Sequence, residues 1–264
     1  MKKKLTIKDL LESKGKKKLS EVYVNNYKEA LACEKAGIDM IITSETNDIC
    51  KIRKNSQNIF LTVGLVHGKH VTEKKILKAS YRALKLGADA IYCPQGIKFV
   101  KALSHEDIAV IGHVGFIPYK SSWFGGYKAV GKTVEDAINV YNLTKAYEDA
   151  GAIGVEMEIV PSQIAEEITK RTKILVISMG SGKNCDAQYL FADDILGYNE
   201  SHIPRHAKIY RNHKKIYEEI LNDSIDAFKE FKKDVEKGLY PENKHIVNID
   251  KEIHNYFINK LETK

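Results

Sequence analysis

The chain has 264 residues, of which 43% are hydrophobic and 29% are charged, and its formal net charge is +7. This composition is typical of a globular protein and excludes disordered and fibrous classes, and the length allows one large domain or two small ones. No apolar run approaches the roughly 20 residues that would span a bilayer, so we expect no contact with a membrane. The N-terminus lacks the pattern of a secretory signal and the four cysteines form no C-x-x-C pair, so we expect a cytoplasmic protein with free thiols.

The positive charge is concentrated at the N-terminus. Residues 1–20 hold eight lysines and two acidic residues, which gives +6, and the other residues together carry only +1. This segment, with a short helix predicted over Thr6–Ser13, has no aromatic residue, whereas nucleic-acid-binding surfaces usually combine basic and aromatic side chains. We interpret it as a solvated lysine-rich helix and expect no nucleic-acid partner, with contact to another polyanion as the alternative.

After residue 18, apolar runs rich in β-branched residues alternate with helical patterns. The nearly continuous apolar runs are typical of parallel strands that are covered on both faces. The expected strands are Glu21–Val24, Met40–Thr43, Ile59–Val66, Ala90–Cys93, Ile108–Ile111, Gly154–Ile159, Ile174–Ile177 and Ile195–Leu196. Helices are expected between them, for example over Tyr27–Lys35, Glu73–Leu86, Val134–Ala150 and Pro161–Arg171.

This alternation predicts the fold. The similar strings KAGIDMII, KLGADAIYC and DAGAIGVEM each end a helix on glycine shortly before a strand. Eight such units favour a (β/α)8 TIM barrel over about residues 18–211, with an open doubly wound sheet as the alternative. The charged helical stretch that follows, about residues 212–264, is expected to pack on the barrel, so that the chain forms a single domain with a helical C-terminal extension.

In such a barrel the reactive groups lie at the carboxyl ends of the strands. Two features are found at those ends. His113 stands between glycines and is followed by a Gly-Gly-Tyr-Lys loop that includes Lys128, and the string VEMEIVP places Glu156 and Glu158 on one face of a buried strand. A carboxylate in such a strand is costly unless it is paired, bound to a ligand or protonated. Glu158 is therefore a candidate catalytic group, or else an ion-pair partner of Lys128 or Lys170.

Several motifs in one order resemble the ketopantoate hydroxymethyltransferase family. They are GHVGFIPYKSSWFGGYKAVGKTVEDA, EIVPSQIAEEIT, ISMGSGKNCDAQYL, DDILGYNESHIPRHAKIY and KGLYPENKH. The resemblance implies a (β/α)8 barrel that transfers a hydroxymethyl group from 5,10-methylenetetrahydrofolate to 3-methyl-2-oxobutanoate, the first step of pantothenate biosynthesis. It also implies a homo-oligomer and a divalent cation, usually magnesium, that polarises the carbonyl of the 2-oxo acid.

The resemblance also implies roles for individual residues. The family's Glu-x-x-Pro falls on Glu158, which would be the base that removes the proton from C3 of the substrate. His113, Lys128, Thr46 and Ser181 would bind or orient the substrate, and Glu45 would be a metal ligand in Ser44-Glu45-Thr46, where the family has Gly-Asp-Ser.

The remaining metal ligands of the family are absent. Where the family has Asp-Leu-Pro-Phe, this chain has Gly64-Leu65-Val66-His67, and Lys-x-Glu-Gly-Gly is replaced by YCPQG at residues 92–96. His67 and His70 could hold zinc or manganese with Glu45, or they could be solvated. The chain could therefore be a hydroxymethyltransferase, a paralogue with another 2-oxo-acid lyase or aldolase activity, or a non-catalytic binding or assembly barrel.

Overall fold

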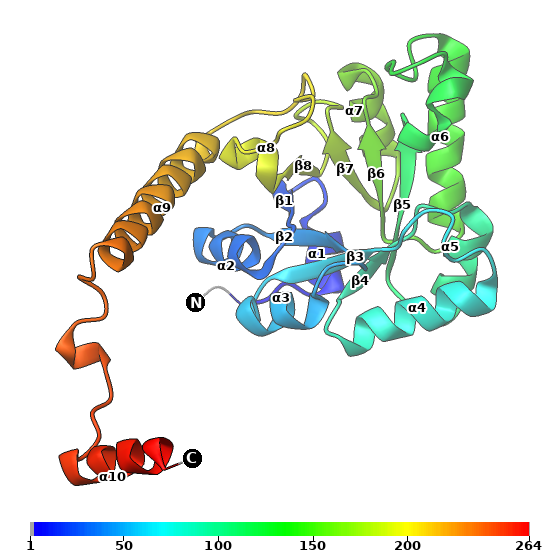
Figure 1. Cartoon of the computed structure of the whole chain (residues 1–264). Coiled ribbons are helices and arrows are strands. Elements are labelled where there is room, and N and C mark those ends of the chain that lie inside the picture. The colour runs from blue at the N-terminus through cyan, green and yellow to red at the C-terminus, as the bar shows by residue number, and fades with distance from the viewer. Residues whose placement is uncertain (1–2, 264) are drawn as a thin grey trace. The chain divides into compact units, whose positions relative to one another are not determined.

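The structure is a computed structural model that describes residues 3–263, and it divides into two compact units, residues 1–211 and 212–264. The first unit is a closed barrel of eight parallel strands in chain order, which confirms the predicted (β/α)8 fold (Figure 1). The strands are β1 (Leu19–Tyr23), β2 (Met40–Ser44), β3 (Phe60–Gly64), β4 (Ala90–Tyr92), β5 (Val110–Gly115), β6 (Gly154–Glu158), β7 (Leu175–Met179) and β8 (Ala187–Phe191).

Helices cover the outside of the barrel, and an apolar cluster between helices and strands forms the larger core. Most helices begin at a residue whose side chain caps the first turn, such as Asn26, Thr72 or Thr133. The helices of this unit are α1 (Ile7–Ser13), α2 (Tyr27–Ala36), α3 (Ile49–Asn55), α4 (Glu73–Lys85), α5 (Ile97–Ser104), α6 (Val134–Asp149), α7 (Ser162–Arg171) and α8 (Ala192–Leu196), with a 3-10 helix, η1, over Pro118–Phe124.

The expected position of the eighth strand was wrong. Ile195–Leu196 lies in α8, and β8 is formed by Ala187–Phe191, which pairs with β1 from Leu19 to Tyr23 and closes the barrel. The string AQYLF contains glutamine and tyrosine among its apolar side chains and therefore does not stand out as an apolar run. The helix that follows ends at Gly197, whose left-handed backbone (φ 70°) is typical of a helix C-terminus.

The lysine-rich N-terminus closes the amino-terminal end of the barrel and is not simply solvated. Leu10 of α1 is 1% exposed and packs into the barrel interior with residues that begin strands, such as Leu19 and Phe60. Lysines of the segment form ion pairs with acidic residues beside those strands: Lys4 with Asp89 (2.5 Å), Lys14 with Asp186 (2.6 Å) and Lys17 with Asp39 (2.7 Å). Three of the eight lysines that suggested a polyanion partner are thus paired within the fold.

The second unit contains α9 (His213–Glu236), a 3-10 helix, η2 (Asn243–His245), and α10 (Lys251–Glu262). Its larger apolar side chains are exposed, including Ile220, Leu221, Phe228 and Phe231 along α9. The expected packing of this unit on the barrel stays a prediction. Within residues 3–263 no helix combines the length and the apolarity that crossing a membrane would require.

Candidate active site at the carboxyl end of the barrel

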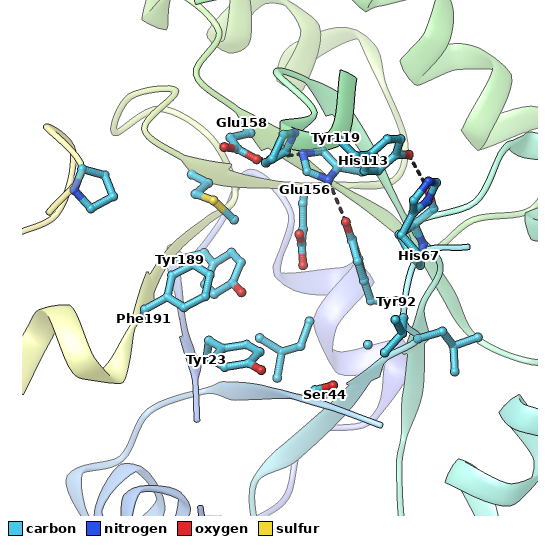
Figure 2. A pocket seen from close by; sticks show the side chains of 18 of the residues that line it. Tyr23, Ser44, His67, Tyr92, His113, Tyr119, Glu156, Glu158, Tyr189 and Phe191 are labelled. Atoms are coloured by element: carbon cyan, nitrogen blue, oxygen red, sulfur yellow. Dashed lines mark hydrogen bonds and ion pairs between the residues drawn. The ribbon is translucent and has the colours of Figure 1, made fainter. Parts of the chain in front are cut away.

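A cavity of about 500 Å³ lies at the carboxyl end of the strands (Figure 2). Ser44, Gly64, Tyr92 and Glu158, each at the end of a strand, contribute to its wall, together with aromatic side chains of β1 and β8. None of the described residues that line it is a lysine or an arginine. They are Tyr23, Ile42, Ser44, Gly64, Leu65, Val66, His67, Tyr92, Pro94, His113, Pro118, Tyr119, Glu156, Glu158, Met179, Tyr189, Phe191, Pro204 and His206.

Glu158 ends β6 and is 8% exposed. Its backbone oxygen accepts a hydrogen bond from the Phe116 N–H at 2.8 Å, and the next residue, Ile159, has a positive φ of 50°. Such a backbone is uncommon for a β-branched residue and indicates that the turn after Glu158 is held by its surroundings. The alternative role as partner of Lys128 or Lys170 was wrong. Lys170 pairs with Glu166 and Glu167 on its own helix, and no ion pair joins Lys128 to Glu158 among the described residues.

His113 on β5 contacts Glu158, as the sequence led us to expect of two groups in one site. Its Nε2 lies 3.1 Å from Glu158 Oε2, but the two groups are not aligned for a hydrogen bond, and Nε2 has no other acceptor among the described residues. On the other side of the ring, Nδ1 lies 2.7 Å from the Tyr92 hydroxyl. Burial and the nearby Glu156 raise the pKa of Tyr92 well above its usual value, so this hydroxyl is neutral, and its contact with Nδ1 fixes the orientation of the ring.

A second carboxyl group, that of Glu156, points into the same cavity (Figure 2). Glu156 is 4% exposed, and no hydrogen bond from another described residue reaches its side chain. Burial raises the pKa of Glu156 well above its usual value, and Glu21 and Glu158 raise it further. Glu21, on β1, has neither carboxyl oxygen hydrogen-bonded, and burial raises its pKa to about 8. Our sequence reasoning did not single out Glu21, although a glutamate inside the strand SEVYV was a signal.

The other predicted site residues lie outside this cavity. Thr46 is exposed, and its hydroxyl is 2.7 Å from that of Ser44. Ser181 is 1% exposed; it donates to the Met157 carbonyl (2.8 Å) and accepts from the Val160 N–H (2.9 Å). Ser181 therefore uses its hydroxyl group to bind the backbone before and after Glu158, and it stabilises the end of β6.

Glu45 is engaged by neighbouring protein groups. It accepts a hydrogen bond from the Val66 N–H (2.9 Å), and its two oxygens both lie 2.9 Å from His70 Nε2. Burial would raise the pKa of Glu45, but these hydrogen bonds and the charge of Lys69 together lower it below its usual value. Glu45 is therefore an ionised carboxylate that is already paired with Lys69 and His70.

The residues present do not fit the expected divalent cation. His67 stacks on Tyr119 with ring centroids 3.5 Å apart and so does not converge with His70 on Glu45, and the Gln95 amide donates to the Val66 carbonyl at 3.2 Å. Over residues 3–263 no three His, Cys, Asp or Glu side chains are grouped so that they could hold a metal ion. Magnesium requires several hard oxygen ligands, and the described loops after β2, β3 and β4, where the ligands were expected, bring only the already paired carboxylate of Glu45 to this place.

Lys128 lines a second, larger cavity of about 920 Å³ that shares Glu158 and His206 with the first. Its wall combines cationic side chains, Lys128, Lys132 and Arg205, with the rings of Phe116 and Tyr127, whose centroids are 5.3 Å apart. Glu158 thus stands between an apolar, hydroxyl-rich cavity and a cationic, aromatic one.

Comparison with known proteins agrees with the resemblance in the motifs. The family model of ketopantoate hydroxymethyltransferase matches residues 47–243. The chain is 30% identical to the 3-methyl-2-oxobutanoate hydroxymethyltransferase of Kosmotoga olearia, with 90% of this chain and 95% of the relative covered. It is 31% identical to that of Staphylothermus marinus, with 92% and 96% covered. A solved phosphonopyruvate hydrolase is similar in fold, with a TM-score of 0.53 at 13% identity over 100% of this chain and 98% of that one. The chain therefore belongs to the ketopantoate hydroxymethyltransferase family.

Proposed function

We propose that this protein transfers a hydroxymethyl group from 5,10-methylenetetrahydrofolate to 3-methyl-2-oxobutanoate, with Glu158 as the base. The observation that carries the proposal is the position of Glu158, a buried carboxylate at the carboxyl end of a barrel strand that faces two adjoining cavities and lies 3.1 Å from His113. We further propose that the protein acts in the cytoplasm as a homo-oligomer and serves pantothenate biosynthesis.

In the first step Glu158 removes the proton from C3 of the 2-oxo acid. The electron pair of the C–H bond becomes the C2–C3 double bond, and the carbonyl electrons move onto oxygen to form an enolate. His113 positions Glu158, because its Nε2 lies 3.1 Å from the carboxyl group and the Tyr92 hydroxyl, 2.7 Å from Nδ1, fixes the orientation of the ring. The apolar wall of the cavity suits the branched hydrocarbon end of the substrate.

In the second step both C–N bonds that hold the one-carbon unit to the folate break, water adds to that carbon as the hydroxyl group, and the enolate carbon forms the new C–C bond with it. Tetrahydrofolate leaves, and its two nitrogens take up one proton from Glu158 and one from the water. The larger cavity suits this co-substrate, since Phe116 and Tyr127 can contact an aromatic ring system and Lys128, Lys132 and Arg205 can attract a carboxylate tail. The shared residue Glu158 places the base where the two substrates meet.

The test is product formation. The protein is incubated with 3-methyl-2-oxobutanoate and 5,10-methylenetetrahydrofolate, and the hydroxymethylated 2-oxo acid is quantified by chromatography and mass spectrometry. We expect Glu158→Gln to lower the rate at least about 100-fold, as is typical when a general base is lost, while the exposed Glu135→Gln keeps it. Enolisation without transfer would instead support a lyase or aldolase. Absence of both enolisation and substrate binding would support a non-catalytic barrel.

A further inference from the structure

The barrel interior holds more carboxyl groups than it can ionise. Glu21, Glu156 and Glu158 are each at least 90% buried, and Glu21 and Glu158 both act on Glu156 electrostatically. The titratable groups that face Glu156 are these two carboxyls, the hydroxyls of Tyr92 and Tyr189, and His113 across the β5–β6 pair. No lysine or arginine lines the cavity among the described residues. Cations line only the larger cavity that Glu158 shares, and none lines the cavity that Glu156 faces among the described residues. Three carboxylates this deeply buried would repel one another strongly in a medium of low dielectric, so a proton remains on at least one of them.

The surroundings decide which group keeps its proton. Glu158 has polar and cationic neighbours, with His113 Nε2 at 3.1 Å from its carboxyl group and Lys128, Lys132 and Arg205 in the larger cavity that it also lines. Glu156 has no hydrogen-bond partner among the described residues, although it is 96% buried and faces the cavity (Figure 2). A buried carboxyl group without a partner is stable only in its neutral form, and its O–H then points to whatever fills the cavity.

We propose that Glu156, as a neutral carboxylic acid, donates a hydrogen bond to the enolate oxygen that develops when Glu158 removes the proton from the 2-oxo acid. The inference rests on the function proposed above and gives that site a further catalytic residue. Two carboxyl groups two residues apart on β6 thereby take opposite roles, Glu158 as the base and Glu156 as the hydrogen-bond donor. The donor set around Glu45 does not fit a cation, and Glu156 supplies the stabilisation of negative charge that the resemblance had led us to assign to one.

The hydroxyls nearby do not replace Glu156 in this role. The Tyr92 hydroxyl is already engaged in a hydrogen bond with His113 Nδ1 at 2.7 Å. A carboxylic acid is also a more acidic donor than a phenol, and its hydrogen bond strengthens more as negative charge develops on the acceptor. The charge of the enolate is thus met by an O–H group fixed on a rigid strand.

The first experiment follows exchange of the C3 proton of 3-methyl-2-oxobutanoate with D₂O by NMR in the presence of EDTA. We expect the wild type to exchange without added metal, Glu156→Leu to lose at least about 100-fold in rate, as on removal of an oxyanion donor, and Glu156→Gln, which retains a weaker N–H donor, to lie between them. Glu21→Gln is the matched control, because Glu21 is equally buried but does not line the cavity. It is expected to stay within about threefold of the wild type, since its hydrogen-bond capacity is not used in the reaction.

The second experiment does not depend on turnover. The infrared spectrum of the wild type minus that of Glu156→Gln at neutral pH should contain the C=O stretching band of a protonated carboxyl group. In calorimetry, oxalate, which resembles an enolate of a 2-oxo acid, should bind the wild type and bind Glu156→Leu at least about tenfold more weakly. Far-UV circular dichroism shows whether each variant is folded.

The outcomes separate this inference from the function on which it rests. If the wild type exchanges in EDTA but Glu156→Leu exchanges equally fast, the role of Glu156 is wrong and the proposed function stands. A wild type that exchanges only with added cation also overturns the role of Glu156. If the difference spectrum contains a carboxylate band in place of the protonated one, Glu156 is ionised and the inference fails, whatever the activity. If no condition gives exchange, the proposed function fails first.

Discussion

The unpaired carboxyl group of Glu21 predicts an unusual dependence of stability on pH. Glu21 is 2% exposed on β1, and burial raises its pKa from 4.5 to about 8. Between these two values the folded chain holds a proton that the unfolded chain releases, so the free energy of unfolding falls as pH rises. One such group lowers it by about 1.4 kcal/mol for each pH unit in this window.

The perturbation is Glu21→Gln, which keeps the shape of the side chain and removes its titration. Between pH 5 and pH 7 the wild type should lose about 3 kcal/mol because of Glu21 alone, and Glu156 adds a loss in the same direction. Over the same pH range Glu21→Gln should lose about 3 kcal/mol less of its unfolding free energy than the wild type. The slope of the unfolding free energy against pH therefore becomes shallower by about 1.4 kcal/mol per pH unit. Glu156 keeps its own contribution, because burial is the largest cause of its raised pKa.

The assay is urea denaturation followed by circular dichroism at a series of pH values, with unfolding free energies obtained by linear extrapolation. The slope is a better readout than the stability at one pH, since a packing defect shifts the whole curve without changing its slope. Glu135→Gln, an exposed glutamate on α6, is the control and should leave the slope unchanged. Equal slopes for the wild type and Glu21→Gln would show that Glu21 is ionised or paired in the folded chain.

Three further predictions concern the site and the assembly. Gly115→Ala should destabilise the fold by about 2 to 5 kcal/mol, because residue 115 has a φ of 86° and a Cβ there would lie 2.3 Å from the Glu158 carbonyl oxygen. The displaced Glu158 should also abolish exchange of the C3 proton of the 2-oxo acid. A variant that melts and exchanges like the wild type would contradict this. Lys128→Ala with Lys132→Ala should raise KM for the folate about tenfold or more and leave KM for the 2-oxo acid unchanged. Steady-state kinetics measure both constants, with Lys74→Ala as the control. Equal effects on both substrates would refute the assignment of the larger cavity to the folate. The proposed homo-oligomer predicts that Phe228→Glu with Phe231→Glu, both exposed on α9, lowers the mass measured by light scattering, whereas Lys233→Glu does not. An unchanged mass would show that this face of α9 is not between subunits.

The barrel could be predicted from the sequence because seven of its strands overlap predicted, mostly apolar runs that alternate regularly with helices. The eighth strand could not be located in this way. Ala187–Phe191 contains glutamine and tyrosine, and it becomes a strand because its backbone pairs with β1. The role of the N-terminal lysines was also missed, since ion pairs such as Lys14 with Asp186 join residues 172 positions apart.

Site residues could be predicted where the position of one residue at a strand end is enough to assign it. They could not be predicted where the assignment depends on contacts among several side chains. Glu158 and His113 follow from their places at strand ends, and the structure brings them together. The same reasoning could not foresee that His70 would take Glu45 while His67 stacks on Tyr119, because both contacts depend on how the loop after β3 folds back. It also left open which buried carboxyl group is neutral, since that depends on the neighbours that β1 and β5 bring to β6.

The central claim is that Glu158 enolises a 2-oxo acid in a site that needs no divalent cation. Its most direct test is the exchange of the C3 proton of 3-methyl-2-oxobutanoate in D₂O, followed by NMR for the wild type and Glu158→Gln, each with EDTA and with added magnesium. We predict exchange by the wild type that EDTA does not abolish and a loss of at least about 100-fold in Glu158→Gln under both conditions. Exchange that requires magnesium, or that survives the loss of Glu158, would contradict the account.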